Sequence, residues 1–181
     1  MIQINIVSRF TEDKNMFFAV LFAVHQLKEQ GINDVTVLFI GDILSEALYR
    51  STHTLIDLFD LSDRVNFTKR SIRFADMTEG MKQGYFLNFT IGNFVGFSGI
   101  ESINNGFKTI FLNLDRSLDD RTVVSASQCN SVDSFIALLK NLSTDKAFTD
   151  KLILEDNLSM KQDLHLNATD SSILLSILSP A

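Results

Sequence analysis

The sequence predicts an α/β fold in which a parallel β-sheet carries helices on both faces. Short apolar runs alternate along the chain with segments of helical spacing, the pattern typical of such sheets. The run at residues 35–40 is apolar almost throughout, as expected of a parallel strand that is buried on both sides. The 181 residues suffice for one domain with a sizeable core, and the only proline, Pro180, leaves no proline-rich linker that would divide them.

Each element follows from its local pattern. Alternating or continuous apolar residues predict strands at residues 2–7, 35–40, 65–67, 85–89, 109–112 and 123–125. Helical spacing predicts helices at residues 15–30, 45–59 and 73–82, a short one around Glu101, and a helical tail at 131–142, 145–158 and 167–178. Asn15 is the expected N-cap of the first helix, which Gly31 ends. The loops after the strands are expected to gather at one edge of the sheet, where ligands bind in open α/β folds.

Charge and cysteine content exclude several classes of function. The net charge of −6 argues against a general nucleic-acid binder, which needs an excess of Lys and Arg, so we expect no nucleic-acid partner. Cys129 is the only cysteine, which excludes an intrachain disulfide and a cysteine zinc cluster and favours a reducing compartment. Residues 1–9 lack a signal-peptide pattern, and the apolar run at 16–24 is shorter than the roughly 20 residues of a membrane span. We expect a cytoplasmic protein, either free or peripheral at the inner face of the cytoplasmic membrane.

Two cations lie where the first strand meets the first helix. This loop holds neither the Gly-x-Gly-x-x-Gly turn of dinucleotide-binding proteins nor the Walker pattern of nucleotide triphosphatases, and it offers Arg9 and Lys14 instead. Arg can hold a phosphate through two parallel hydrogen bonds, and Lys can neutralise it as a mobile charge. Alternatively, the two cations pair with Glu12 and Asp13 at the surface, and their spacing leaves both interpretations open.

A glycine-bearing loop at residues 93–106 is the most informative segment of the chain. It follows the apolar run at 85–89 and precedes the one at 109–112, so a short helix is expected to begin at the carboxyl end of a strand. Free backbone N–H groups and the helix dipole favour an anion at such a place. Glu101 lies early in this helix, where its carboxylate can accept hydrogen bonds from sugar hydroxyls. The segment therefore predicts a site for a phosphorylated, hydroxyl-rich ligand.

Four segments resemble, in the same order, motifs of retaining, nucleotide-sugar-dependent glycosyltransferases of group 1, which have the two-domain GT-B architecture. Residues 9–15 resemble their Gly-Arg-Leu-x-x-Glu-Lys-Gly loop, and residues 37–42 resemble the strand and turn that end in Gly-Asp-Gly-Pro. Residues 63–67 resemble their Asp-Arg-Val-x-Phe stretch, and residues 93–106 resemble their paired-glutamate loop and helix. The matches extend over about residues 1–115, at spacings similar to those of the family.

The resemblance implies that residues 1–181 form one Rossmann-like domain, the carboxyl-terminal, donor-binding half of such an enzyme. Arg9 and Lys14 would bind the diphosphate of the nucleotide sugar, and Glu101 would bind the ribose hydroxyls. Asn93 stands where the family has the first glutamate of its pair, and together with the two cations it would form the catalytic group. The remaining contacts with the donor would come from Gly41, Arg70, Ile72, Gly96, Phe97 and Ser98.

The same resemblance implies a reaction and its partners. The donor would be a nucleotide sugar, UDP-linked on family grounds, with no metal and no further cofactor, because the cations and the helix N-terminus stabilise the departing diphosphate. A hexose or N-acetylhexosamine would pass to a glycan or lipid-linked acceptor in the synthesis of a bacterial surface polysaccharide such as O-antigen. We expect the chain to lack the acceptor-binding domain that precedes this half in the family. Such a truncated piece would bind a nucleotide but transfer no sugar by itself.

Departures from the motifs of the family leave two alternatives. Asn93 replaces the first glutamate of the pair, and Phe94 replaces the glycine that follows it. A non-catalytic nucleotide-binding module, or half of a sugar-nucleotide epimerase, would fit the same motifs. A receiver-type signalling domain fits less well, because it needs an acidic pair after its first strand, where this chain has Arg9.

Overall fold

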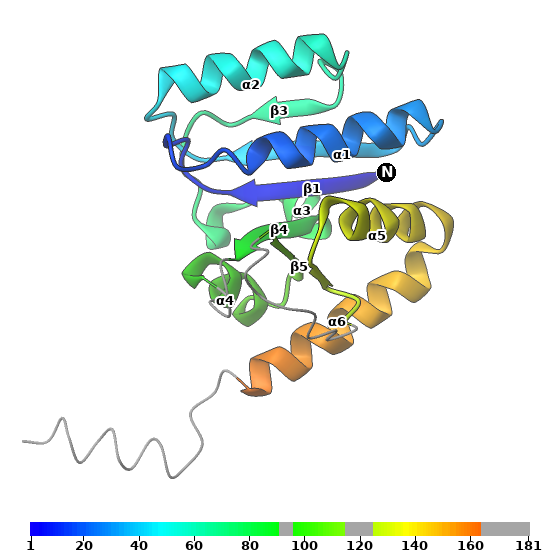
Figure 1. The fold of residues 1–181 in the computed structure, drawn as a ribbon. Helices are drawn as coiled ribbons and strands as arrows, with labels where there is room; N and C mark the ends of the chain where they lie inside the picture. The colour runs from blue at the N-terminus through cyan, green and yellow to red at the C-terminus, as the bar shows by residue number, and fades with distance from the viewer. Residues whose placement is uncertain (91–95, 115–124, 164–181) are drawn as a thin grey trace, which may run out of the picture.

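The structure, a computed structural model, describes residues 1–90, 96–114 and 125–163 and confirms the α/β fold. Within this part of the chain a parallel sheet has the strand order β3-β2-β1-β4-β5-β6. From β1 the chain first builds outward to β2 and β3, and it then crosses to the other side of β1 to add β4 (Figure 1). The strands are β1 (Ile2–Val7), β2 (Val35–Ile40), β3 (Val65–Phe67), β4 (Tyr85–Thr90), β5 (Lys108–Asn113) and β6 (Gln128–Cys129).

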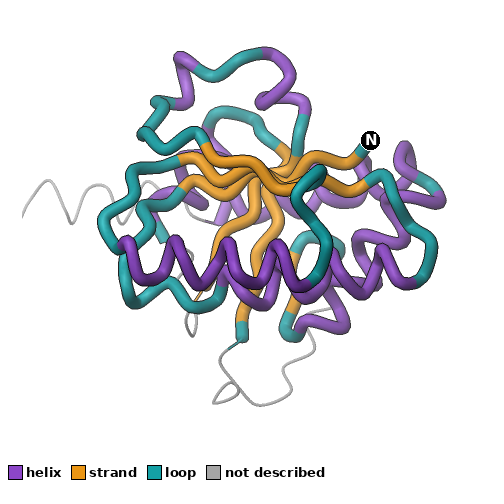
Figure 2. The backbone as a smooth tube through the Cα atoms, turned by 90° about the horizontal axis from the view of Figure 1, so that it is seen from above, coloured by secondary structure: helices purple, strands orange, loops and turns teal. Residues whose placement is uncertain are grey.

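Helices cover both faces of this sheet, as Figure 2 shows. They are α1 (Phe17–Glu29), α2 (Glu46–Leu58), α3 (Glu79–Gln83), α4 (Phe97–Asn104), α5 (Val132–Thr144) and α6 (Lys146–Asp163). Side chains of β2 alternate between two apolar clusters, because successive side chains of a strand point to opposite faces. Val37 and Phe39 belong to the larger cluster, which includes α1 and α5, whereas Leu38 and Ile40 belong to a smaller one around Phe74.

The first helix begins later than expected. Asn15 is not its N-cap, because Met16 takes that position without a side-chain hydrogen bond and α1 starts at Phe17. The cause is packing: the ring of Phe17 lies 4.7 Å from that of Phe10, and both side chains are fully buried. This contact determines where the helix starts and leaves Asn15 exposed in the turn before it.

The prediction of a single helix at residues 73–82 is wrong. A 3₁₀ turn at Phe74–Asp76 and α3 are separated by Met77 and Thr78, whose backbones are extended. Thr78 accepts a hydrogen bond from the N–H of Met81 at 3.3 Å and so caps α3. A threonine hydroxyl satisfies a free backbone N–H at a helix start, which favours a cap over a helix interior. The extended step at Met77 also places its side chain in the smaller apolar cluster.

The last strand differs from the expectation as well. Residues 123 and 124 of the strand expected at 123–125 lie outside the described residues, and Ser125 is not in a strand. Asp156 of α6 accounts for this, because its carboxylate accepts hydrogen bonds from the hydroxyl of Ser125 at 2.6 Å and from the N–H of Ser127 at 2.9 Å. The carbonyl of Ser127 accepts a hydrogen bond from the N–H of Phe111 at 2.7 Å, and residues 128–129 then form the short strand β6 beside β5.

α6 is longer than expected and runs to Asp163, past the expected end at residue 158. Within this helix, the side chain of Asn157 acts as a strand partner for β5. Its amide accepts a hydrogen bond from the N–H of Thr109 at 2.7 Å and donates one to the Thr109 carbonyl at 2.9 Å. The helix expected at 167–178 lies outside the described residues.

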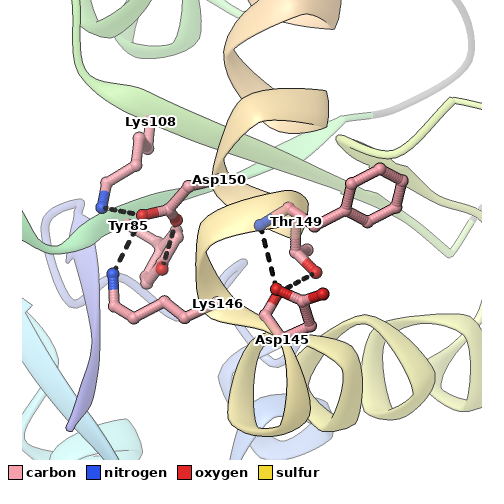
Figure 3. Close-up of polar contacts among 7 residues, drawn as sticks. Tyr85, Lys108, Asp145, Lys146, Thr149 and Asp150 are labelled. Carbon is pink, nitrogen blue, oxygen red and sulfur yellow. Dashed lines mark hydrogen bonds and ion pairs between the residues drawn. The ribbon is translucent and has the colours of Figure 1, made fainter.

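A polar cluster fixes the start of α6 to the amino-terminal ends of β4 and β5 (Figure 3). The carboxylate of Asp150 accepts hydrogen bonds from the hydroxyl of Tyr85 at 2.5 Å, from Lys108 at 3.2 Å and from Lys146 at 3.0 Å. Burial alone would raise the pKa of Asp150, but these donors hold it below its usual value. Burial and the neighbouring Asp150 raise the pKa of Tyr85 to about 12. The cluster lies at the edge of the sheet opposite to the carboxyl ends of the strands.

Candidate functional site

The candidate site lies at the carboxyl ends of β1 and β4. The chain turns to opposite sides of the sheet after these two neighbouring strands, and in open α/β sheets ligands bind between connections that diverge in this way. Residues 8–16 lead from β1 to α1, and α4 follows β4 after residues 91–95, which lie outside the described residues. Figure 1 shows this loop and α4 at the edge toward which the strand arrows point.

Backbone hydrogen bonds hold the loop after β1 against the turn after β2. The N–H of Ser8 donates to the carbonyl of Ile40 at 3.0 Å, and the N–H of Phe10 donates to the carbonyl of Asp42 at 2.9 Å. Because the side chain of Phe10 points into the core, the adjacent Arg9 is exposed at the edge of the sheet. The ring of Phe10 packs among those of Phe17, Phe39, Tyr49 and Phe67.

Gly41 permits the close approach of these two segments. A Cβ at this position would lie 2.1 Å from the carbonyl oxygen of Ser8, closer than real Cβ contacts come. Gly41 is therefore buried against the loop that carries Arg9, and its observed contact is with the backbone of that loop. The sequence placed Gly41 among the donor-binding residues, and the structure supplies a packing reason for a glycine at the same position.

The two predicted cations have different surroundings. Arg9 is exposed, and no acid among the described residues forms an ion pair with it. Lys14 lies 3.3 Å from the carboxylate of Asp13, as the alternative interpretation expects. Hydrogen bonds from Thr11 and Lys14 lower the pKa of Asp13. An exposed ion pair of this kind is weak, so the ammonium group of Lys14 can separate from Asp13 and bind an anion instead.

α4 begins at the same edge without a side-chain cap. Its N-cap is Gly96, whose φ of 76° lies in the left-handed region that favours glycine. The hydroxyl of Ser98 donates to the side-chain carbonyl of Asn88 on β4 at 2.9 Å, which ties the first turn of the helix to the strand. Glu101 is exposed about one turn further along, and Phe97 is exposed next to Gly96. α4 thus brings together four of the predicted donor-binding residues.

The loop after β3 holds two further predicted residues. Arg70 is exposed, whereas the side chain of Ile72 packs in the smaller apolar cluster with Val7 and Ile40, the last residues of β1 and β2. Ile72 therefore reaches the carboxyl edge, but its side chain belongs to the core. Asn93, the predicted catalytic residue on the other side of the switch point, lies outside the described residues.

Two sets of side-chain hydrogen bonds that support these loops are not predicted from the sequence. The carboxylate of Asp42 accepts hydrogen bonds from the N–H and the hydroxyl of Ser71, and Asn88 accepts one from Ser98. Asn88 could have been found as an amide within an otherwise apolar strand. No signal in the sequence relates Asp42 to Ser71, because 29 residues separate them.

A hollow of about 460 Å³ lies elsewhere, between β6, α5 and α6. Its one charged residue among the described lining is Asp145, so the hollow does not suit a diphosphate, and we place the candidate site at the switch point instead. In the described part of the chain, no three His, Cys, Asp or Glu side chains gather in a way that could hold a metal ion. None of the described helices is long and apolar enough to cross a membrane.

Comparison with known proteins yields solved structures of the same fold. Neither a protein-family model nor a curated protein sequence matches the chain. It resembles the Anabaena protein Alr3699/HepE, solved with UDP and glucose, at a TM-score of 0.70 and 15% identity, over 97% of this chain and 47% of that one. A Rickettsia africae glycosyltransferase matches at a TM-score of 0.70 and 16% identity, over 100% and 49%. The C-terminal domain of LpcC, a glycosyl transferase group 1 family protein of Francisella tularensis, matches at 0.61 and 12%, over 90% and 85%.

These likenesses show the fold. The chain spans about half the length of the Anabaena and Rickettsia proteins, and it corresponds to most of the LpcC C-terminal domain. It therefore has the fold of one half of a GT-B architecture, which confirms the fold predicted from the sequence.

Proposed function

We propose that this chain is the donor-binding half of a glycosyltransferase that uses a nucleotide sugar, with UDP as the nucleotide. The proposal rests chiefly on the cation-bearing loop after β1 and on the start of α4 at Gly96, which share one edge on either side of the switch point. HepE, which has this fold, was solved with UDP and glucose. Because one fold hosts many functions, the residues at this edge carry more weight than the likeness.

The parts of the site match the parts of a nucleotide sugar. Arg9 and Lys14 supply two positive charges for the diphosphate, and the start of α4 adds the positive end of a helix dipole. Glu101, on the same helix, offers a carboxylate to the hydroxyls of the ribose. The loop at residues 70–72, where Arg70 and Ser71 are exposed, is the proposed contact of the base.

In the transfer reaction, Arg9 and Lys14 would stabilise the negative charge that develops on the departing diphosphate. We propose no metal ion or other cofactor for this role. Asn93 would bind a hydroxyl of the donor sugar without adding charge. The family resemblance supports retention of anomeric configuration, a hexosyl donor, a glycan or lipid-linked acceptor and a cytoplasmic location. The acceptor would be held by a second domain. Since catalysis depends on positioning both substrates, this half alone is expected to bind UDP without transferring sugar.

Calorimetric titration with UDP tests the proposal. We expect saturable binding that the double substitution Arg9→Ala plus Lys14→Ala weakens by about tenfold or more, because charge-assisted hydrogen bonds are lost. The matched control is Lys140→Ala plus Lys151→Ala, which removes the same charge from α5 and α6 and should leave the affinity unchanged. No saturable binding at millimolar UDP, or equal affinities of the two double variants, would contradict the proposal.

Asn93 favours a second candidate, a non-catalytic nucleotide-binding module, because it replaces a glutamate of the family motif. Pairing the chain with an acceptor-binding domain separates the candidates. Sugar transfer to an acceptor supports the transferase, and firm UDP binding without transfer supports the binding module. Inversion at a carbon of the donor sugar, with no need for an acceptor, supports the epimerase alternative.

A further inference from the structure

Asp42 is bonded to both loops that the proposed nucleotide would contact. It lies in the turn directly after β2 and is half-buried. Its backbone carbonyl accepts a hydrogen bond from the N–H of Phe10, the neighbour of Arg9, at 2.9 Å. Its carboxylate accepts two hydrogen bonds from Ser71 in the loop after β3, one from the N–H at 3.2 Å and one from the hydroxyl at 2.5 Å. One residue thus joins the cation-bearing loop to the loop proposed for the base.

Further hydrogen bonds link the loop after β3 to the end of β2 and stabilise its turn. The N–H of Gly41 donates to the hydroxyl oxygen of Thr68 at 3.3 Å, and that hydroxyl donates to the carbonyl of Arg70 at 2.7 Å. Lys69, between these two residues, has a φ of 55°, a left-handed conformation that is unfavourable for a residue with a side chain. Strained backbone of this kind persists where the surrounding structure fixes it, and it is commoner at functional sites than elsewhere.

The contacts of the Asp42 carboxylate do not suggest a purely structural role. None of the ion pairs in the described part of the chain includes it. Among the described residues, the two hydrogen bonds that this carboxylate accepts both come from Ser71, which is exposed. Holding an exposed serine adds little to a core, but it fixes the position of the backbone around Ser71 relative to Arg9.

We propose that Asp42 is a positioning residue that fixes the spacing between the cation-bearing loop and the loop at residues 68–72. With that spacing fixed, one nucleotide engages both loops at once, and its base and diphosphate bind as a single unit. The inference rests on the proposed function, since it needs the diphosphate at Arg9 and the base near Ser71. It makes Asp42 a determinant of base selectivity that itself touches neither end of the ligand.

Ser71→Ala and Asp42→Ala test the inference, with UDP, ADP and inorganic diphosphate as probes in calorimetric titrations. Ser71→Ala changes no charge and truncates an exposed side chain, so the protein should stay folded. We expect it to weaken UDP by about threefold to tenfold, to reduce the preference for UDP over ADP, and to leave inorganic diphosphate within about twofold. Asp42→Ala should weaken UDP by about tenfold, while inorganic diphosphate binds equally well or better because a negative charge has been removed.

The control is Asp57→Ala, which also removes a carboxylate that accepts a serine hydroxyl: the hydroxyl of Ser62 donates to Asp57 in one longer hydrogen bond of 3.4 Å, at the far end of α2. It should leave all three affinities unchanged. Equal losses for UDP and inorganic diphosphate in both site variants would overturn the inference, because a general loss of structure acts on every ligand. Unchanged affinity and unchanged base preference would overturn it as well. If Asp42→Ala fails to fold, Ser71→Ala decides the matter alone.

The same titrations distinguish failure of this inference from failure of the proposed function. If the unmodified protein binds neither UDP nor inorganic diphosphate, the proposed function is wrong. If it binds UDP, and the double substitution of Arg9 and Lys14 weakens that binding by about tenfold or more, the proposed function stands. If the preference for UDP over ADP is then unchanged in both Ser71→Ala and Asp42→Ala, only the role of Asp42 is refuted.

Discussion

Gly41→Ala tests whether the close approach between the loop after β1 and the turn after β2 governs the candidate site. An added Cβ would lie 2.1 Å from the carbonyl oxygen of Ser8, 2.7 Å from its carbonyl carbon and 3.2 Å from the backbone nitrogen of Arg9. All three are backbone atoms, so no side-chain rotation relieves the contact. Ordinary separations begin at 3.4 Å, so the carbonyl oxygen must retreat by about 1.3 Å, and Arg9 is displaced with it.

A displacement of this size affects stability and binding differently. Overpacking of a close contact costs about 1–3 kcal/mol, which a folded domain of this size can survive. A misplacement of about 1 Å in a binding group can lower function by as much as about a hundredfold. We therefore expect Gly41→Ala to fold with a reduced melting temperature and to bind UDP at least about tenfold more weakly. Thermal unfolding and calorimetric titration measure the two effects separately.

Gly80→Ala is the matched control for this substitution. Its added Cβ would meet nothing closer than the Thr78 hydroxyl oxygen at 4.0 Å, and Gly80 lies in α3. Alanine is favoured over glycine in a helix, so stability should be unchanged or slightly higher, with UDP affinity unaffected. The reasoning is refuted if Gly41→Ala matches Gly80→Ala in both melting temperature and UDP affinity.

Three further predictions concern stability. The folded-state pKa of Asp150 is lowered, so its stabilising effect is present above the usual carboxylate pKa and is lost as pH falls; urea unfolding should show the deficit of Asp150→Asn shrinking below about pH 4. The pKa of Tyr85 is raised to about 12, so the stability that its protonated hydroxyl contributes is complete below about pH 10. This stability is lost as the pH rises toward 12, and Tyr85→Phe should remove that pH dependence from the urea unfolding curve. Asn157→Leu leaves the buried N–H and C=O of Thr109 unpaired and should cost about 2–4 kcal/mol in urea unfolding, with faster hydrogen exchange at Thr109; a cost near zero would contradict the strand-partner role.

Much of the fold is predictable because buried strands appear in the sequence as runs of apolar residues. Strands β1, β2 and β5 appear as short apolar runs, and their parallel arrangement follows from the helical segments between them. The errors occur where a distant contact outweighs the local pattern. The start of α1 is set by packing of Phe17 on Phe10, and Asp156 of α6 holds Ser125 and Ser127 outside β6. Neither contact has a periodic signature.

The candidate site divides in the same way. The positions of Arg9 and Glu101 at this edge of the sheet are predictable, because Arg9 follows the end of a strand and Glu101 lies early in the helix that follows another strand. The supporting links are not predictable, since Asp42 meets Ser71 only once β2 and β3 are paired in register. Gly41 could be recognised as a turn residue, but its contact with Ser8 depends on how two separate connections pack.

The most direct measurement is a UDP titration of isotopically labelled protein, followed through its backbone amide resonances. If the cations of the loop after β1 and the first turn of α4 bind one nucleotide, saturable shifts should appear together at residues 9–14 and 96–101, with a common dissociation constant. Shifts confined to the hollow between α5 and α6, or different dissociation constants for the two segments, would contradict a single shared site.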